Sequence, residues 1–323
     1  MCIDKTIDVD TSITDGKPDA APRAEALADP LVSCRNLTKR YGDVLAVDEI
    51  TFSLAPGTVT GFLGPNGAGK TTTLRMLLGL AEPSGGEALV FGRRYRELEQ
   101  PIRRVGAVLE STDYHPSRSG RDHLRMLALA AELPLSRVEA VLELVQLTTA
   151  ASRRVRTYSL GMRQRLGLAA ALLGDPELLI LDEPMNGLDP GGMEDTRLMI
   201  RGLVAEGRTV VLSSHLLDEV EKTCDAIAIV DRGRVVAQGS IEELTGGAET
   251  LLVSTGDDLR ARALLNGHEV EVVEEGLRVH THEAALINRR LVEAGIDVHR
   301  LEPERISLER RFLELTTRLE AAA

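Results

Sequence analysis

A glycine-rich segment that contains one lysine and one threonine is the part of the sequence best suited to chemistry. Closely spaced glycines let backbone N–H groups turn toward a phosphate without Cβ clashes. The helix expected next would point its positive end at the anion. Lys70 would supply a positive charge for the β- and γ-phosphates, and the Thr71 hydroxyl is a ligand suited to Mg²⁺. The segment matches G-x-x-x-x-G-K-[ST] in full, and with the following threonine it comprises Gly64, Pro65, Asn66, Gly67, Ala68, Gly69, Lys70, Thr71 and Thr72.

Two adjacent acids follow a short apolar run further along the chain. The run Leu178–Leu181 leads directly into Asp182, Glu183 and Pro184. Alone, such acids more often mark a solvated turn, but a phosphate loop earlier in the chain favours a catalytic role. Asp182 is then suited to Mg²⁺, and Glu183 to orienting or deprotonating a water, which typically accelerates a reaction by about 10²–10⁴-fold.

Strand-like and helix-like segments alternate around these motifs. A β-prone segment at 58–63 precedes the phosphate loop, and a helix is expected at 71–80. Buried strands that alternate with helices indicate a mostly parallel sheet with helices on its faces. The further strands are expected at 88–91, 105–109, 178–181, 209–213 and 226–230, and the further helices at 121–132, 136–147, 161–173, 193–205 and 216–222.

Composition shifts divide the chain into three parts. Residues 1–29 are rich in Asp, Thr, Ala and Pro, which favours a disordered arm. Residues 30–245 carry all the motifs, with an inserted helical subdomain at about 112–173. After a glycine-containing break, residues 246–323 predict a small accessory α/β domain. The fold class is therefore α/β with a helical insertion and a C-terminal α/β appendage.

Charge and composition exclude several classes of function. The 323-residue chain has a net charge of −12 and only 2% aromatic residues, which disfavours binding to nucleic acid. No apolar stretch reaches the roughly 18 residues that span a bilayer. The cysteines Cys2, Cys34 and Cys224 match no zinc or redox spacing, which favours free thiols in a reducing cytosol.

Taken together, the motifs and their order resemble the ATP-binding subunits of ABC transporters, a class of P-loop NTPases, over about residues 31–245. An aromatic residue precedes the phosphate loop, and a second segment lies between that loop and a signature loop that begins at Tyr158. The acid pair is followed by a D-loop and a switch histidine. The residues that carry this resemblance, besides the phosphate loop and the acids, are Tyr41, Glu110, Ser159, Gly161, Asp189 and His215.

The resemblance implies a mechanism in which ATP with Mg²⁺ is held between two copies of the chain, arranged head to tail. Tyr41 would stack on adenine, and Thr71, Glu110 and Asp182 would serve the metal. Lys70, Glu183 and His215 would be the catalytic residues. The remaining implied contacts are made across the dimer, by Ser159 and Gly161 to the γ-phosphate and by Asp189 between the two sites.

Two departures from the commonest family pattern point to one branch. Glu110 stands where most members carry Gln, and the signature loop has Leu160 and Met162 in place of Gly and Gln. With the C-terminal segment Ile306–Thr316, these features are similar to the bacitracin, lantibiotic and multidrug exporters that work with ABC-2 type permeases. The branch implies a peripheral protein at the cytoplasmic face of the membrane, which contacts its permease near residues 110–121.

Other functions remain open at the level of sequence. A soluble ABC-type ATPase that acts on nucleic acid or ribosomes is one alternative, although the acidity and the short interval between Lys70 and Asp182 oppose it. An ATP-binding switch without turnover is another, opposed by the intact catalytic residues. The sequence does not reveal the cargo.

Overall fold

The computed structural model describes residues 30–109, 114–245, 250–304, 307–313 and 315. The predicted arm at 1–29 lies outside these residues, and so does Glu110. In the described part of the chain, no helix combines the length and apolar character needed to cross a membrane.

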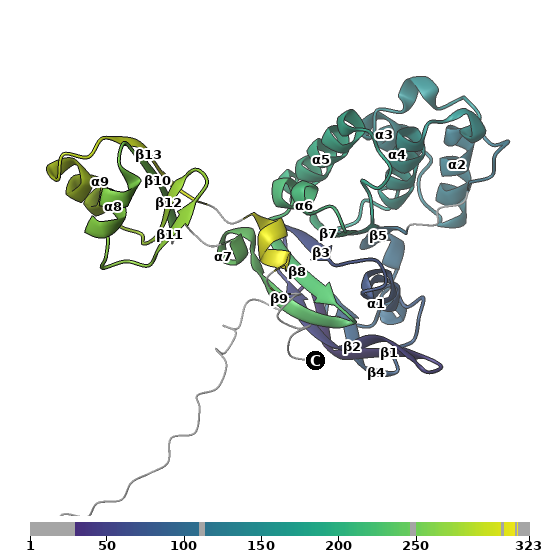
Figure 1. The fold of residues 1–323 in the computed structure, drawn as a ribbon. Helices are drawn as coiled ribbons and strands as arrows, with labels where there is room; N and C mark the ends of the chain where they lie inside the picture. The colour runs from purple at the N-terminus through teal and green to yellow at the C-terminus, as the bar shows by residue number, and fades with distance from the viewer. Residues whose placement is uncertain (1–29, 110–113, 246–249, 305–306, 314, 316–323) are drawn as a thin grey trace, which may run out of the picture.

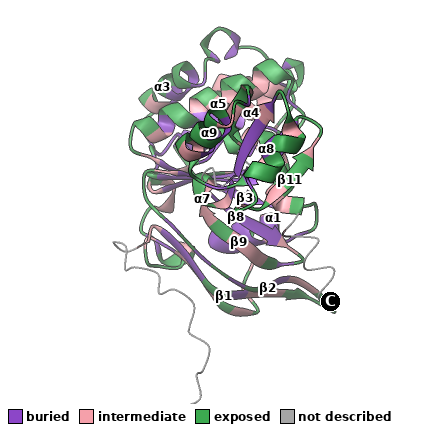
Figure 2. Ribbon diagram, turned by 60° about the vertical axis from the view of Figure 1, so that its left-hand side comes forward, coloured by how far each residue is buried: buried purple, intermediate pink, exposed green. Residues whose placement is uncertain are grey.

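A six-stranded sheet in the order β5-β6-β7-β3-β8-β9 forms the centre of the larger body (Figure 1). All neighbouring pairs are parallel except β8 and β9. Every residue of β3, β6 and β7 is buried, as expected for strands covered on both faces (Figure 2). In sheet order the strands are β5 (Val105–Val108), β6 (Leu178–Asp182), β7 (Thr209–Ser214), β3 (Val59–Leu63), β8 (Ala226–Asp231) and β9 (Arg234–Ser240).

The helices fall into those that accompany the sheet and those inserted between β5 and β6. The inserted group is α2 (Gly120–Ala130), α3 (Ser136–Leu144) and α4 (Leu160–Ala171). Short 3₁₀ turns occur at Tyr95–Glu97, Pro101–Arg103, Thr148–Ala150 and Val155–Thr157. The other helices of this body are α1 (Lys70–Leu77), α5 (Pro190–Ala205), α6 (Leu217–Thr223) and α7 (Ile241–Thr245). The predicted α/β fold class with a largely parallel sheet is confirmed.

An antiparallel sheet in the order β2-β1-β4 lies beside the phosphate-loop helix. Its strands are β1 (Val32–Tyr41), β2 (Val44–Leu54) and β4 (Gly85–Val90). Phe52 of β2 meets Phe62 of β3 with ring centroids 5.2 Å apart, inside a core that also holds Leu74 and Leu77 of α1. Strands β1 and β2 are not among those predicted from the sequence, because irregular register shifts interrupt their polar–apolar alternation.

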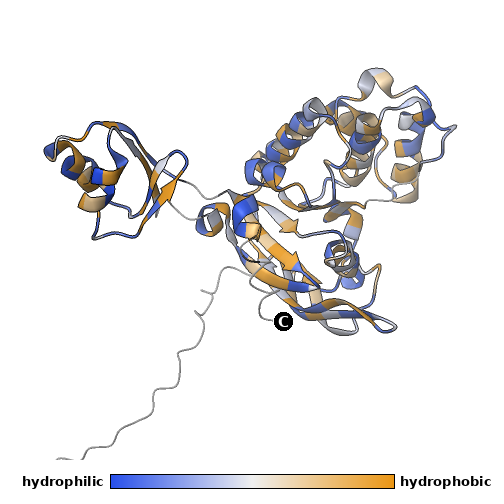
Figure 3. Ribbon diagram, in the orientation of Figure 1, coloured by the Kyte–Doolittle hydropathy of each residue, from blue (hydrophilic) through white to orange (hydrophobic). Residues whose placement is uncertain are grey.

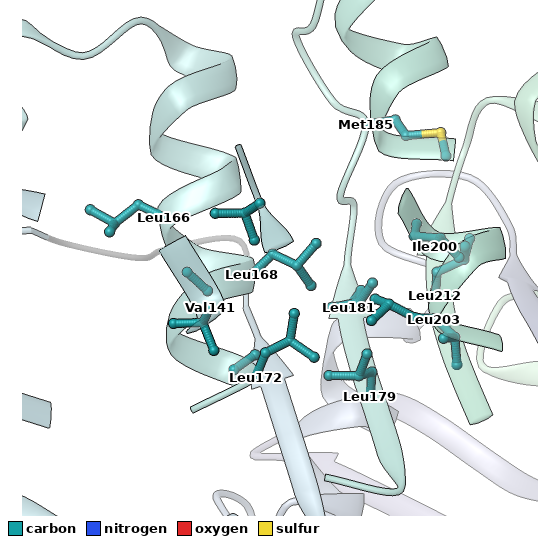
Figure 4. Packing of buried hydrophobic residues seen from close by; sticks show 14 of the residues in the cluster. Val141, Leu166, Leu168, Leu172, Leu179, Leu181, Met185, Ile200, Leu203 and Leu212 are labelled. Atoms are coloured by element: carbon teal, nitrogen blue, oxygen red, sulfur yellow. The ribbon is translucent and has the colours of Figure 1, made fainter. Parts of the chain in front are cut away.

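A continuous apolar layer joins α4 to the central sheet (Figure 4). Leu166 and Leu168 come from α4, Leu172 directly follows that helix, and Leu179 and Leu181 come from β6. Figure 3, coloured by hydropathy, shows apolar residues concentrated in the central strands. Since β6 ends at Asp182 and is followed directly by Glu183, this layer fixes the signature helix relative to the acids.

A second, smaller sheet in the order β11-β12-β10-β13 has a core of its own. All of its neighbouring pairs are antiparallel, and α8 and α9 share the core formed by residues such as Leu251 and Ile287. The elements are β10 (Thr250–Thr255), α8 (Asp258–Leu264), β11 (Val270–Val273), β12 (Gly276–His280), α9 (Ala284–Glu293) and β13 (Val298–Pro303).

After β13, the chain returns to the larger body in a helical segment at 308–313. Leu308 is fully buried in the core of that body, and Phe312 and Leu315 pack against the same core. The Leu308 N–H donates to a carboxylate oxygen of Glu221 on α6 at 3.2 Å. The last described residues therefore pack with the nucleotide-binding body and not with the small sheet.

Candidate functional site

The phosphate loop joins the buried strand β3 to the start of α1. A Cβ at Gly64 would lie 2.2 Å from the carbonyl oxygen of Val230, so the neighbouring strand leaves no space for a side chain. Gly69 adopts φ 102° as the residue before the helix, a conformation that glycine adopts without a Cβ penalty. The loop is therefore held by tertiary contacts in the shape that precedes the helix N-terminus.

The three predicted catalytic residues are linked through Glu183, which contacts both Lys70 and His215. Lys70 is 6% exposed, and its Nζ donates to the carbonyl oxygen of Gly64 at 2.7 Å. The same Nζ lies 3.3 Å from Glu183 Oε1. Glu183 Oε2 lies 2.9 Å from His215 Nδ1. One carboxylate thus bridges the lysine of the phosphate loop and the histidine that follows β7.

Asp182 lies beside this cluster in a buried network of oxygen atoms. Its Oδ1 accepts hydrogen bonds from Ser213 Oγ at 2.6 Å and from Thr71 Oγ1 at 3.2 Å. Its Oδ2 is buried, with no hydrogen-bond partner among the residues that the structure describes. Ser213 Oγ also accepts from the Glu183 N–H at 2.9 Å. Ser213 is not among the predicted site residues, and the only signal for it in the sequence is its position two residues before His215.

A cavity of about 410 Å³ opens over the phosphate loop. Gly64 and Ala68 lie beneath it and support the loop, because Gly64 accepts from Lys70 and the Ala68 carbonyl accepts from the Gly233 N–H. Its lining comprises Ala46, Pro65, Asn66, Gly67, Gly69, Lys70, Thr71, Thr72, Glu183, Asn186 and His215. Ala46 and Asn186 are lining residues that the motif analysis did not assign to nucleotide.

Tyr41 does not line this cavity. The ring is 49% exposed near the end of β1, and Lys39 Nζ lies 4.9 Å from its centroid. The turn that follows leads into β2, whose Ala46 does reach the cavity.

The predicted cross-dimer residues lie away from the phosphate loop of their own chain. Ser159 is exposed and caps α4, where its Oγ accepts from the Met162 N–H at 3.2 Å. Asp189 is exposed and caps α5 through the Gly192 N–H at 3.2 Å. Neither residue lines the phosphate cavity, and nor does Gly161. Their surfaces at two helix N-termini are open to a partner.

A second cavity, of about 340 Å³, lies on the α4 side of the acid pair. Asp182 lines it from the end of β6, Glu183 and Asn186 line it from the loop that follows, and Leu160 and Gln164 line it from α4. The Gln164 Nε2 donates to the Asn186 carbonyl oxygen at 3.0 Å. The acids are therefore flanked by the phosphate loop on one side and by the signature helix on the other.

Comparison with known proteins gives the family. A family model described as "ABC transporter" matches residues 47–186. The bacitracin transport ATP-binding protein BcrA of Bacillus licheniformis is 36% identical over 88% of this chain and 97% of its own length. The chain belongs to the ABC transporter ATP-binding proteins. The daunorubicin resistance ATP-binding protein DrrA3 of Streptomyces coeruleorubidus is 38% identical over 90% of this chain and 97% of its own length.

Solved structures agree with this assignment. The structure of cbiO1 from Clostridium perfringens, part of the ABC transporter complex cbiONQ, superimposes with a TM-score of 0.61 at 28% identity. The match covers 67% of this chain and 91% of cbiO1. This ABC transporter subunit therefore binds and hydrolyses ATP, and the nucleic-acid alternative is not supported.

Proposed function

We propose that this ABC transporter subunit holds ATP with Mg²⁺ between two copies of itself and drives export through a separate membrane permease. The observation that carries the proposal is the Glu183 carboxylate, which joins Lys70 at 3.3 Å and His215 at 2.9 Å beside the phosphate cavity. A lysine for phosphate, a base for water and a histidine to orient both are the groups that phosphoryl transfer to water requires.

The residues present suit Mg²⁺. The buried Asp182 Oδ2 lacks a partner among the described residues, and the Thr71 hydroxyl lies against the other oxygen of that carboxylate. Mg²⁺ is usually held by one or two carboxylates together with substrate phosphates and water. This agrees with the described part of the chain, where no group of three or more His, Cys, Asp or Glu side chains forms a dedicated metal cage. When bound, Mg²⁺ would neutralise charge that develops on the phosphates. Glu110, which lies outside the described residues, remains a proposed ligand.

Lys70 and Glu183 form an ion pair whose side chains are only 6% and 9% exposed. An arriving γ-phosphate offers Lys70 a more highly charged partner, which releases Glu183 Oε1 to accept a hydrogen bond from water. His215 keeps the other carboxylate oxygen in place. The catalytic base would then act only once the nucleotide is in its site, which limits unproductive proton transfer.

A second copy would complete the site. Ser159 and Gly161 lie at the N-terminus of α4, where unpaired backbone N–H groups and the helix dipole favour an anion. Because these residues do not line the phosphate cavity of their own chain, we propose that they reach the γ-phosphate held by the partner, with Asp189 between the two sites. Tyr41 remains our proposal for the adenine contact, although it would have to turn toward the cavity.

The direction of transport and the class of cargo are proposed from the relatives. Two of these relatives are named for bacitracin transport and for daunorubicin resistance. We therefore propose export of a drug-like or peptide compound, through an ABC-2 type permease that carries this subunit at the cytoplasmic face of the membrane. Residues 30–245 would form the ATP-binding domain and 246–323 an accessory domain, with 1–29 as a disordered arm. The described residues of the segment at 307–315 pack against the ATP-binding domain and would attach the accessory domain to it.

Replacing Glu183 tests the proposed chemistry. With Glu183→Gln, the ATPase rate of the purified protein should fall by at least about 100-fold because the base is lost. Dimers that persist only with ATP should accumulate, as measured by size-exclusion chromatography. Glu143→Gln, on the exposed side of α3, is the matched control and should keep the wild-type rate. Turnover in Glu183→Gln equal to that of the wild type would remove Glu183 from this role.

A further inference from the structure

The Gln164 side chain links two parts of the site that the proposed mechanism uses separately. It projects from the second turn of α4, five residues after Ser159. Its Nε2 donates to the Asn186 carbonyl oxygen at 3.0 Å. Its Oε1 is buried and has no hydrogen-bond partner among the described residues. A buried amide oxygen left in this state is costly, so packing alone would be served better by an apolar side chain of similar length.

The link continues directly to the catalytic carboxylate residue. The Asn186 N–H donates to the Glu183 carbonyl oxygen at 3.1 Å, which closes the turn after the acid pair. The backbone of Glu183 has φ 50°, a left-handed conformation that is uncommon for residues other than glycine. A turn in this conformation persists when its surroundings determine it, and the hydrogen bond from Gln164 is one such determinant.

The loop also packs on the first turn of the signature helix. A Cβ at Gly187 would lie 2.9 Å from Leu160 Cδ2, and a Cβ at Gly161 would lie 3.4 Å from Leu188 Cδ2. Ser159 caps the same helix through the Met162 N–H. The signature loop, α4 and the loop after Glu183 are therefore in close contact, with Gln164 supplying a directional polar bond between them.

We propose that Gln164 is a positioning residue that couples the two nucleotide sites through a single chain. Its signature loop meets the nucleotide of the partner, and its Glu183 serves the nucleotide of its own phosphate loop; this inference rests on the proposed function. When the partner's nucleotide displaces the signature loop, α4 moves with it, and Gln164 transmits the displacement to Asn186 and Glu183. Hydrolysis at one nucleotide then depends on whether the other is bound.

Two variants separate the hydrogen bond from the shape of the side chain. Gln164→Met keeps the length of the side chain but has no N–H donor and only a weakly accepting sulfur. Gln164→Glu keeps an oxygen but places a carboxylate against the Asn186 carbonyl. Steady-state ATPase measurements over a range of ATP concentrations give kcat, KM and the Hill coefficient. Both variants should lower kcat about tenfold and reduce the Hill coefficient to about one. KM should stay within about twofold, because Gln164 does not line the phosphate cavity.

Arg165→Met is the matched control. Arg165 follows Gln164 on the same helix but pairs with Asp195 on α5 and contacts Gln146. Its replacement should lower the melting temperature and leave the Hill coefficient of the wild type unchanged. A merely structural role for Gln164 would give the same pattern as Arg165→Met.

The outcomes separate this inference from the proposed function. If the wild-type protein hydrolyses ATP cooperatively and Gln164→Met has the same kcat and Hill coefficient, the coupling role is overturned and the proposed function is not. A Gln164→Glu variant with wild-type cooperativity would also overturn it, since the donor would then be dispensable. A wild-type protein that neither hydrolyses ATP nor dimerises with it would instead count against the proposed function.

Discussion

At the scale of single residues, Ser213 organises both acids. Its hydroxyl donates to Asp182 Oδ1 at 2.6 Å and accepts from the Glu183 N–H at 2.9 Å. The residue is fully buried at the end of β7, whose register places it opposite Asp182 of β6. One side chain therefore fixes the carboxylate proposed for the metal and the backbone of the proposed base.

Replacing Ser213 should separate catalysis from nucleotide binding. Ser213→Ala removes both hydrogen bonds, so we expect kcat to fall by roughly tenfold to 100-fold and the Kd of ATP to change little. ATPase assays and fluorescent-nucleotide titrations measure the two quantities. Ser214→Ala is the matched control, since that hydroxyl accepts from the Leu216 N–H instead. Equal losses in the two variants would contradict the role given to Ser213.

At the scale of elements, α6 connects the switch histidine to the end of the chain. This helix begins at Leu217, two residues after His215, and Glu221 near its end accepts from the Leu308 N–H. The segment at 308–313 therefore supports the element that follows the catalytic histidine. This contact makes the C-terminal segment part of the core that holds the site.

Truncating Leu308 tests that support. Its side chain is fully buried in the large core, so Leu308→Ala should destabilise the protein by about 2–5 kcal/mol, because a cavity remains where the side chain packed. Denaturant unfolding measures the change. Leu313→Ala, at a position that is 56% exposed, should stay within about 0.5 kcal/mol of the wild type. Similar losses in both variants would show that the packing of Leu308 is not specific.

At the scale of the whole molecule, the division of site residues decides the architecture of the active assembly. Lys70 Nζ and Glu183 Oε1 lie 3.3 Å apart in one chain, whereas Ser159 lines no part of the phosphate cavity of that chain. A head-to-tail dimer would place half of each site on each copy.

Mixing inactive variants tests this division. Lys70→Ala and Ser159→Arg each inactivate both sites of a homodimer, but a mixed dimer regains one complete site. Mixing equal amounts should restore up to about a quarter of the wild-type ATPase rate, because about half of the dimers are mixed and each has one working site. Coupling between the two sites would lower the recovered rate below this limit but not abolish it. The mixture of Lys70→Ala with Glu183→Gln is the control and should stay inactive, since both residues belong to the same half-site. Recovery in the control mixture, or none in the test mixture, would contradict the head-to-tail arrangement.

The sequence by itself determined the features that depend on local order along the chain. A strand, a glycine-rich loop and a helix follow one another from β3 to α1, and the apolar run before Asp182 could only be a buried strand. The largely parallel α/β fold followed from this alternation. Family membership also followed from the order of motifs, because that order is itself a property of the linear sequence.

Only the tertiary structure decided which residues meet across the sheet. Ser213 and Asp182 lie on neighbouring parallel strands, and Gln164 reaches Asn186 from an inserted helix. Leu308 contacts α6 although the whole small sheet lies between them in the sequence. The strands β1 and β2 were missed for a related reason, since their irregular register is set by cross-strand pairing. Periodicity reports which face of an element is buried, whereas the partner on that face depends on how distant elements pack.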